Sequence, residues 1–348
     1  MKRADIIVDL QFGSCGKGLL AGWLAKRNKP DTVIAAWGPN AGHTFIDAHG
    51  RKMVTTMIPN GVVSPNLRRI MIGPGAVINP QSMLAEIKEL CDIIGDAEIY
   101  IHAHAAVVTE SHRGAESEAM FKIGSTMKGV GEAVIQKIRR DPDAQNVAAV
   151  ALRDTPLEGC VVGPEDYWNQ LTRANVAQIE GSQGFSLGIN SGFYPYVTSR
   201  ECTTQQIMSD CAIPRKLFRT RVIGTARTFP IRVANRYDKE GNQIGWSGPG
   251  YWDQDELTWE EVGVPAELTT VTRLPRRVFS FSPSQVEQAI YMNGADEVFL
   301  NFCNYVNPET DKLRDIVEAI EQFAPVTLTG WGPTEDDIVV RRTLGEAL

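Results

Sequence analysis

Short apolar runs and amphipathic stretches alternate along most of the chain. The run over residues 4–12 contains three consecutive β-branched residues, Ile6, Ile7 and Val8, and is typical of a buried strand. Further strands are predicted over 32–37, 69–73, 97–108 and 297–301, and helices over 19–27, 81–94 and 308–323. Because strands alternate with helices, we predict an α/β fold with a mostly parallel central sheet covered by helices.

One segment departs from this alternation. Residues 235–265 are rich in glycine, tryptophan and acidic side chains and do not resemble a core strand or helix. The sequence shows no internal repeat, no low-complexity tract and no obvious linker. We therefore expect one domain over residues 1–348, with an irregular excursion at 235–265.

The composition argues against several classes of protein. The chain has 348 residues, of which 43% are hydrophobic, and this is enough for a large buried core. Its net charge of −7 is unsuited to non-specific nucleic-acid binding, which needs a basic surface. The six cysteines are scattered without a C-x-x-C pair, which argues against a zinc site or a disulfide framework. With no recognisable signal peptide and no apolar run of membrane-spanning length, the expected location is the cytoplasm, without a membrane partner.

The first candidate for chemistry is the glycine-rich loop Gly-Ser-Cys-Gly-Lys-Gly at 13–18, directly after the first predicted strand. Its glycines allow backbone N–H groups to approach an anion, and Lys17 supplies a positive charge at the start of a helix. The lysine is followed by Gly18 rather than Ser or Thr, so the loop is not a standard P-loop. The alternative is a simple turn from strand to helix.

A second candidate loop covers residues 37–44 and follows the second predicted strand. His43 lies in a glycine-bounded loop at the C-terminal end of a strand, which is where open α/β sheets bind ligands. A histidine can act there as a general acid or base. The alternative is a loop histidine whose ring is satisfied by backbone carbonyls.

Three later segments carry polar groups suited to nucleotides. Gln183 can read a purine edge, Thr198 can donate to a phosphate, and Arg276 offers a fork of donors suited to a carboxylate. The late turn 327–333 contains Trp331, which can stack on a base. Alternatively, the segments containing Gln183 and Thr198 are ordinary polar turns. Arg276 would then lie on a solvated basic face, and Trp331 would be part of the core.

Taken in order, these segments resemble adenylosuccinate synthetases along nearly the whole chain. The family loop G-D-E-G-K-G is matched by residues 13–18, N-A-G-H-T is present at 40–44, and Y-P-Y-V-T-S is present at 194–199. The family segment E-G-A-Q-G is matched by residues 180–184. The resemblance implies a P-loop-NTPase-like adenylosuccinate synthetase fold.

The resemblance also implies the reaction. In this family, a nucleoside triphosphate phosphorylates O6 of a 6-oxopurine nucleotide, and the amine of L-aspartate then displaces that phosphate. The residues matching the catalytic positions are Ser14, Lys17 and His43, with His43 as the acid that stabilises the transferring phosphoryl group. Mg²⁺ is the implied cofactor, with Ser14 and Gly42 at the positions of its ligands.

The resemblance assigns residues to three subsites. The triphosphate subsite comprises Gly16, Lys17, Gly18, Gly42, His43, Thr44, Asn304, Gly330 and Trp331. The purine monophosphate subsite comprises Ser14, Asn40, Ser125, Thr126, Arg140, Gln183 and Thr198. The aspartate subsite comprises Val271, Thr272 and Arg276. Arg140 matches an arginine that reaches the neighbouring active site, which implies a homodimer.

Three positions depart from the family pattern. Ser14 replaces the catalytic aspartate that removes the N1 proton, and a serine hydroxyl is a much weaker base and metal ligand. Asn304 replaces the aspartate that reads guanine in GTP, and Leu274 replaces an arginine that contacts the ribose and the aspartate substrate. A small neutral Ser14 leaves room for a purine 2-amino group, and the loss of a donor at Leu274 suits a 2′-deoxyribose.

These departures resemble the bacteriophage branch of the family. Its members use ATP, dGMP and L-aspartate to make N6-succino-2-amino-2′-deoxyadenylate, a precursor of 2,6-diaminopurine in phage DNA. For a phage-encoded chain, the expected location is the cytoplasm of the host bacterium. The alternatives are a divergent adenylosuccinate synthetase that uses IMP and GTP, and a nucleotide-binding regulator without activity. The sequence leaves open which group takes the N1 proton.

Overall fold

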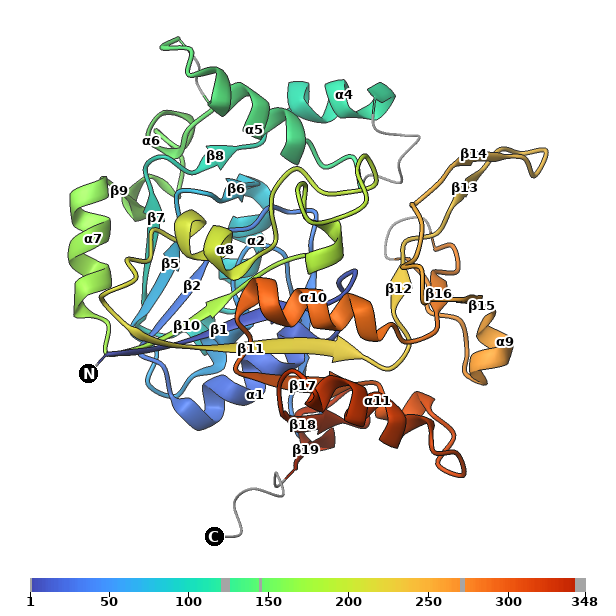
Figure 1. Cartoon of the computed structure of the whole chain (residues 1–348). Coiled ribbons are helices and arrows are strands. Elements are labelled where there is room, and N and C mark those ends of the chain that lie inside the picture. The colour runs from blue at the N-terminus through green and yellow to red at the C-terminus, as the bar shows by residue number, and fades with distance from the viewer. Residues whose placement is uncertain (1, 120–125, 144–145, 270–272, 342–348) are drawn as a thin grey trace, which may run out of the picture.

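The computed structural model describes residues 2–119, 126–143, 146–269 and 273–341. Within these residues, a ten-stranded sheet forms the centre of the molecule (Figure 1). Its spatial order is β19 (Ile338–Val340), β18 (Val326–Gly330), β17 (Glu297–Asn301), β11 (Arg219–Arg227), β1 (Arg3–Asp9), β10 (Val176–Glu180), β2 (Thr32–Ala35), β5 (Arg69–Ile72), β7 (Glu98–His102) and β9 (Val161–Val162). Every neighbouring pair is parallel except β18 and β19. The predicted mostly parallel sheet is confirmed.

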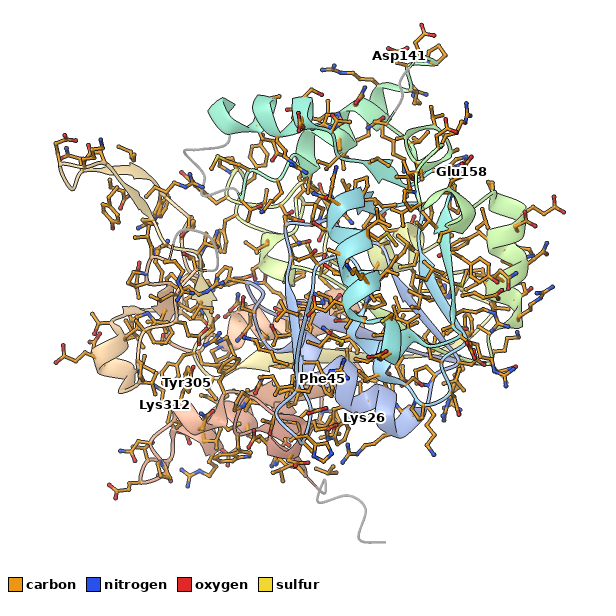
Figure 2. All side chains as sticks on the ribbon, turned by 180° about the vertical axis from the view of Figure 1, so that it is seen from behind. Lys26, Phe45, Asp141, Glu158, Tyr305 and Lys312 are labelled. Carbon is orange, nitrogen blue, oxygen red and sulfur yellow. The ribbon has the colours of Figure 1, made fainter. Side chains whose placement is uncertain are left out.

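Helices cover both faces of this sheet. In Figures 1 and 2, α1 and α2 lie on one face, and α8 and α10 lie on the other. The helices are α1 (Lys17–Asn28), α2 (Pro80–Glu89), α3 (Cys91–Ile94), α4 (Glu110–Ala119), α5 (Val130–Arg139), α6 (Ala148–Ala151), α7 (Pro164–Arg173), α8 (Thr204–Asp210), α9 (Trp259–Val262), α10 (Pro283–Asn293) and α11 (Lys312–Glu321). On the α1 face, Lys26 extends its ammonium group over the ring of Phe45, 5.3 Å from the ring centre (Figure 2).

Three predicted elements differ from the structure. The first strand ends at Asp9 rather than Phe12, because the backbone turns there into the glycine-rich loop. The helix predicted over 81–94 is divided at Leu90 into α2 and α3. The strand predicted over 97–108 is divided into β7 and β8 (Ala106–Val107), because a turn closes with the Ala105 N–H donating to the His102 carbonyl at 2.9 Å.

The predicted excursion is more regular than expected. Residues 235–265 include the ribbon of β13 (Arg236–Tyr237) and β14 (Gln243–Gly245), which projects from the molecule in Figure 1. They also include β15 (Glu256–Leu257), which pairs with β16 (Arg277–Phe279), and β16 in turn pairs with β12 (Ile231–Arg232). A small apolar cluster supports this sheet, separately from the main core, and it contains Phe229, Ile231, Val262, Val278 and Val306. That the chain forms one domain remains a prediction.

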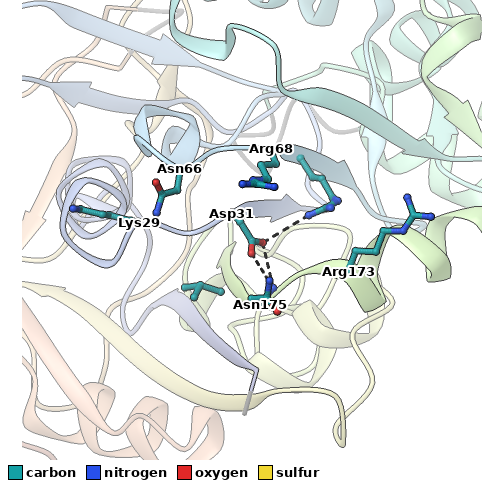
Figure 3. Close-up of a pocket in the computed structure, with 8 residues that line it drawn as sticks. Lys29, Asp31, Asn66, Arg68, Arg173 and Asn175 are labelled. Carbon is teal, nitrogen blue, oxygen red and sulfur yellow. Dashed lines mark hydrogen bonds and ion pairs between the residues drawn. The ribbon is translucent and has the colours of Figure 1, made fainter.

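A basic cavity of about 340 Å³ opens at the edge of the sheet where β10, β2 and β5 begin (Figure 3). Lys29 and Arg173 stand at the C-terminal ends of α1 and α7, where cations compensate the negative end of the helix dipole. Asp31 accepts from the Asn175 N–H at 3.0 Å and lies 3.9 Å from the Arg69 guanidinium. The charges at this edge therefore stabilise the ends of helices and strands.

In the described ranges of the chain, helices are too short or too polar to cross a bilayer.

Candidate active site

The candidate residues gather at the opposite edge of the sheet, where the parallel strands end. The glycine-rich loop follows β1, the loop containing Asn40 follows β2, and Gln183 follows β10. On the other side of β1, Asn304 follows β17 and Trp331 follows β18. Loops at the carboxyl ends of parallel strands form the usual ligand site of an open α/β sheet.

The glycine-rich loop is folded around a buried carboxylate, that of Asp9. One carboxylate oxygen accepts from the N–H groups of Gln11 and Gly13, both at 3.0 Å, and the other accepts from the Cys15 N–H at 3.2 Å. Gly13 and Ser14 take positive φ angles of 89° and 59° to make this turn. The sequence interpretation missed Asp9, although a carboxylate at the end of an apolar run was a usable signal.

Lys17 is buried between this loop and the loop after β10. Its ammonium donates to the Asp9 carboxylate at 3.1 Å and to the Gln183 carbonyl at 2.7 Å, and the side chain is only 5% exposed. The Gln183 amide in turn donates to the Asn40 side-chain oxygen at 3.4 Å. The structure therefore brings Lys17, which was predicted for catalysis and the triphosphate, together with Gln183 and Asn40, which were predicted for the purine monophosphate.

The backbones of the two loops are in direct contact at Gly184. A side-chain Cβ at this position would lie 2.3 Å from the Gly13 nitrogen and 2.4 Å from the Gln11 oxygen. A similar contact joins α1 to β3 (His43–Ile46), because a Cβ at Gly18 would lie 2.7 Å from the Thr44 nitrogen. Both glycines allow backbones to approach more closely than any side chain would permit.

His43 begins β3, which pairs with β4 (Lys52–Thr55). Its Nδ1 lies 2.6 Å from a carboxylate oxygen of Glu180, the last residue of β10, and both side chains are buried. The other Glu180 oxygen accepts from the Asn60 N–H at 2.8 Å, and the Trp37 ring packs 4.6 Å from the imidazole. The partner of His43 is therefore a carboxylate rather than a backbone carbonyl. Because a carboxylate is an acceptor, Nδ1 carries a proton and Nε2 remains for another partner.

Asn301 at the end of β17 links the candidate residues of the triphosphate subsite. Its amide donates to the Cys15 carbonyl at 3.3 Å. A Cβ at either Gly16 or Gly330 would lie 2.1 Å from the Asn301 side chain, so the two glycines lie on either side of it. Asn304 is exposed in a 3-10 turn (Cys303–Tyr305) close by, and Trp331 is 42% exposed and donates to the Thr329 hydroxyl at 3.1 Å.

Other predicted residues have no hydrogen bond to this cluster among the described residues, or they lie outside the described chain. Arg140 follows the C-terminal end of α5 and is exposed, as is Thr126 before that helix. Thr198 is half-buried in the loop 194–199, where its N–H donates to the Leu187 carbonyl. Ser125, Val271 and Thr272 fall outside the described residues. The structure thus does not bring Arg140 and Thr126 into the cluster around Lys17.

Arg276 lies in the segment assigned to the aspartate substrate. Its N–H donates to the Glu267 carbonyl at 2.8 Å, and burial lowers the pKa of its guanidinium. Leu274, which the resemblance predicts to replace a family arginine, is 37% exposed.

The residues around the loop suit a cation only if the substrate provides most of its ligands. Within the described residues, His, Cys, Asp and Glu side chains do not gather in threes as a metal site. The Asp9 carboxylate already receives four donors, whereas Ser14 and Gly42 are exposed. This fits Mg²⁺, which commonly keeps waters and substrate phosphates as ligands.

Comparison with known proteins places this geometry in a family. The sequence model described as adenylosuccinate synthetase matches residues 6–154 and 146–311. A protein of Acinetobacter phage SH-Ab 15497, named N6-succino-2-amino-2′-deoxyadenylate synthase, is 47% identical over 95% of this chain and 92% of its own length. A protein of Salmonella phage PMBT28 with the same name is 48% identical over 97% of each chain.

A solved structure is similar over almost the same length. The cyanophage S-2L succinoaminodeoxyadenylate synthetase, described as bound to dGMP and to dATP as an energy donor, superposes with a TM-score of 0.92. It is 44% identical, and the match covers 99% of this chain and 96% of the other. With its glycine-rich loop, its carboxylate-held histidine and these matches, the chain belongs to the adenylosuccinate synthetase family.

Proposed function

We propose that this protein is a ligase that joins L-aspartate to C6 of dGMP with ATP, giving N6-succino-2-amino-2′-deoxyadenylate, ADP and phosphate. The observation that carries the proposal is Ser14. It is an exposed residue of the glycine-rich loop, which keeps the three glycines and Lys17 of the family pattern, and it stands at the position of the family's catalytic aspartate. The names of the two phage relatives and the dGMP in the cyanophage structure support the same substrate.

The reaction has two steps in this proposal. The γ-phosphoryl group of ATP is transferred to O6 of dGMP while the N1 proton is lost, and ADP leaves. The aspartate amine then attacks C6, the bond from C6 to O6 breaks, and phosphate leaves with O6. In the proposal, Lys17 and the loop N–H groups that do not donate to Asp9 stabilise phosphate charge, and Nε2 of His43 is the donor toward the transferring group.

Substrate choice follows from three positions. At Ser14, a hydroxyl in place of a carboxylate leaves room for the guanine 2-amino group and can accept from it. At Asn304, an amide in place of a carboxylate removes the charged acceptor for guanine in the triphosphate, which favours ATP over GTP. At Leu274, an apolar side chain in place of a donor suits the missing 2′-hydroxyl.

Mg²⁺ belongs to the proposal as the cofactor. The Gly42 carbonyl and the Ser14 hydroxyl are the protein groups that would hold it, together with the substrate phosphates. When bound, it neutralises charge on the phosphate oxygens.

A homodimer also belongs to the proposal. Arg140, exposed after α5, is assigned to the nucleotide of the neighbouring protomer. The enzyme then acts in the cytoplasm of a phage-infected bacterium.

The direct test supplies ATP, Mg²⁺ and L-aspartate with dGMP, GMP or IMP and follows phosphate release and the nucleotide product. The expected result is N6-succino-2-amino-2′-deoxyadenylate from dGMP. Turnover of IMP with GTP, without turnover of dGMP, would instead establish an ordinary adenylosuccinate synthetase. Binding of dGMP and ATP without any product would indicate a regulator.

The variant Ser14→Asp tests the residue that carries the proposal. A carboxylate would crowd the guanine 2-amino group, so kcat/KM for dGMP should fall by about tenfold or more. The comparison is kcat/KM for dGMP and IMP in both proteins, with urea unfolding as the control for stability. Equal or better use of dGMP would contradict the role given to Ser14.

A further inference from the structure

Unpaired cations surround the cavity at the edge of the sheet where the strands begin. Figure 3 shows Lys29, Arg68 and Arg173 arranged around Asp31. They come from separate segments, since Lys29 follows α1, Arg68 precedes β5 and Arg173 ends α7. All three side chains are exposed, and they make no hydrogen bond or ion pair among the residues that the structure describes. The fold thus gathers cations that it does not pair with acids.

The carboxylates nearby are already committed to other donors. Asp31 accepts from the Asn175 N–H at 3.0 Å and lies 3.9 Å from the Arg69 guanidinium. Glu98 stands beside Arg69 on the neighbouring strand, but its carboxylate accepts from the Tyr100 hydroxyl at 2.5 Å. Neither acid contacts the three unpaired cations, so their charge is available to a ligand.

Compensation of helix ends accounts for only part of this charge. The cavity is lined by four cations, Lys29, Arg68, Arg69 and Arg173, and by the single carboxylate of Asp31. The negative ends of α1 and α7 each amount to roughly half a charge, so about two positive charges remain uncompensated.

Two further cations lie beside the cavity. The Lys2 ammonium donates to the Ala174 carbonyl at 2.7 Å, and the Arg3 guanidinium donates to the Asn28 carbonyl at 3.3 Å. Neither cation has a carboxylate partner among the described residues. Although the whole chain carries a net charge of −7, this edge is therefore a local positive region that attracts anions.

The size and lining of the cavity suit a phosphorylated small molecule. Its volume of about 340 Å³ falls in the usual range for small-molecule sites, roughly 300–1,000 Å³. The guanidinium groups of Arg68 and Arg173 present forks of donors that match phosphate oxygens. A phosphate monoester carries nearly two negative charges at neutral pH, which matches the uncompensated charge better than a single carboxylate does. Asn66 and Asn175 add polar groups for the rest of the ligand.

We propose that this cavity is a binding site for the phosphoryl group of a small molecule, with Lys29, Arg68 and Arg173 supplying its positive charge. The site lies at the opposite edge of the sheet from the candidate active site, and its residues belong to none of the three predicted subsites. The proposal therefore does not depend on the proposed function, and a failure of either leaves the other unaffected.

Modification of arginines in the wild-type protein tests this site directly. Phenylglyoxal reacts with exposed guanidinium groups, and mass spectrometry of the peptides gives a separate rate for each arginine. The probes are inorganic phosphate, inorganic tripolyphosphate, ribose 5-phosphate and dAMP, and sodium chloride at matched ionic strength controls for screening. At saturation, we expect a phosphorylated probe to slow the modification of Arg68 and Arg173 by about tenfold. The most potent probe identifies the source of the phosphoryl group.

Arg153 is the control within the same sample. It is exposed, makes no side-chain hydrogen bond or ion pair in the described chain and does not line the cavity. Its modification rate should change by less than about twofold with every probe, because only general screening acts on it.

A matched pair of lysine variants tests the contribution of charge, while both arginine reporters are kept. In Lys29→Gln, the probe concentration for half-maximal protection of Arg68 and Arg173 should rise by about threefold or more. Lys239→Gln removes an exposed lysine between β13 and β14, outside the cavity, and should leave this concentration unchanged.

Three results would overturn the proposal. The first is that no phosphorylated probe protects Arg68 and Arg173 in the wild-type protein, which requires no variant to fold. The second is that Arg153 is protected equally, or that sodium chloride protects as well as the phosphorylated probes do. The third is that Lys29→Gln and Lys239→Gln give the same half-maximal concentration as the wild type.

Discussion

Two buried carboxylates hold the two basic side chains at the centre of the site. Asp9 receives the Lys17 ammonium together with three backbone N–H groups, and Glu180 receives Nδ1 of His43. In a buried environment, a charged group with well-placed donors is favourable, whereas an unpaired charge is costly. Lys17 and His43 therefore depend on Asp9 and Glu180 for their positions.

The first prediction concerns Asp9→Asn. The new amide can still accept from two loop N–H groups, but its NH₂ would face both Lys17 and the Cys15 N–H, which are donors. We expect the free energy of unfolding to fall by about 3 kcal/mol, because a buried ion pair loses one partner. Urea unfolding measures this change. A variant as stable as the wild type would show that the carboxylate does not organise the loop.

The second prediction concerns Glu180→Gln. Both oxygens of Glu180 face donors, the His43 Nδ1–H and the Asn60 N–H, so the amide of the variant must direct its NH₂ group toward one of them. Because the negative charge is lost and the tautomer of His43 is no longer fixed, turnover should fall roughly 100-fold. Binding of dGMP, measured by calorimetry, should remain within about threefold of the wild type, because Glu180 does not contact the nucleotide in the proposal.

A matched control is Glu86→Gln. Glu86 is also buried, at 8% exposed, but it accepts from the N–H groups of Thr56, Met57 and Ile58. This variant should lose stability while the turnover of its folded fraction is kept. Similar turnover losses in both variants would mean that Glu180 acts only through stability.

Individual site residues were predicted best from the sequence where they belong to a recognisable motif. The glycines, Lys17, His43 and Gln183 were all identified, and the structure brings Lys17 and Gln183 into contact. Asp9 could have been found as a charge at the end of an apolar strand. The pairing of Arg227 with Glu267 could not, because ion pairs between distant segments leave no local pattern in a single sequence.

At the scale of elements, the site depends on how closely its loops approach one another. The loop after β1 and the loop after β10 meet backbone to backbone at Gly184, and α1 meets β3 at Gly18. Glycine is required at these contacts because any side chain would overlap the opposite backbone. The loops at this edge of the sheet thus pack closely because these two positions have no side chain, in addition to forming hydrogen bonds.

The third prediction compares Gly184→Ala with Gly42→Ala. A Cβ at Gly184 would overlap the Gly13 nitrogen, whereas a Cβ at Gly42 has no atom within 4 Å. Gly184→Ala should lower the free energy of unfolding by about 3 kcal/mol, because the backbone must move to make room. Gly42→Ala should stay within about 0.5 kcal/mol of the wild type. Urea unfolding of both variants is the measurement, and equal losses would contradict the close contact.

The prediction of elements succeeded where the pattern was unambiguous and failed where local bonds interrupted it. The strand 297–301 was predicted with its observed bounds, because an apolar run over 298–300 lies between Glu297 and Asn301. The strand 97–108 was wrong as one element, since Ala105 closes a turn onto His102. Apolar content continues through that turn, so hydrophobicity alone does not reveal it.

At the scale of the whole molecule, the two edges of the sheet have different roles. The edge where strands begin carries the basic cavity, whose cations stabilise helix ends, while the edge where strands end carries the candidate active site. Arg140 belongs to neither group of contacts within one protomer. Its assignment therefore depends on a second copy of the chain.

The fourth prediction tests that assignment by mixing two variants. His43→Asn and Arg140→Ala should each have turnover reduced by about 100-fold or more, for loss of the acid and of a nucleotide contact respectively. In a mixed homodimer, the Arg140→Ala protomer keeps His43 and receives an intact Arg140 from its neighbour. Statistical mixing should then restore about a quarter of the wild-type activity, since one site in half of the dimers is complete.

The controls for this experiment are each variant mixed with itself, and analytical ultracentrifugation to establish the oligomeric state. Activity that remains at the level of the separate variants, in a sample shown to contain mixed dimers, would remove Arg140 from the neighbouring site.

The central position of β1 in the sheet determines when this strand can pair during synthesis of the chain. Its two neighbours in the sheet are β10 and β11, so Arg3 pairs with Val176 on one side and with Arg219 on the other. While the ribosome is still adding the residues between them, the first apolar strand has no permanent partner, and such delayed pairing exposes a nascent chain to misassembly. β1 therefore pairs with strands that are made well after it, and the glycine-rich loop cannot make its contact with the loop after β10 until that later segment has been synthesised.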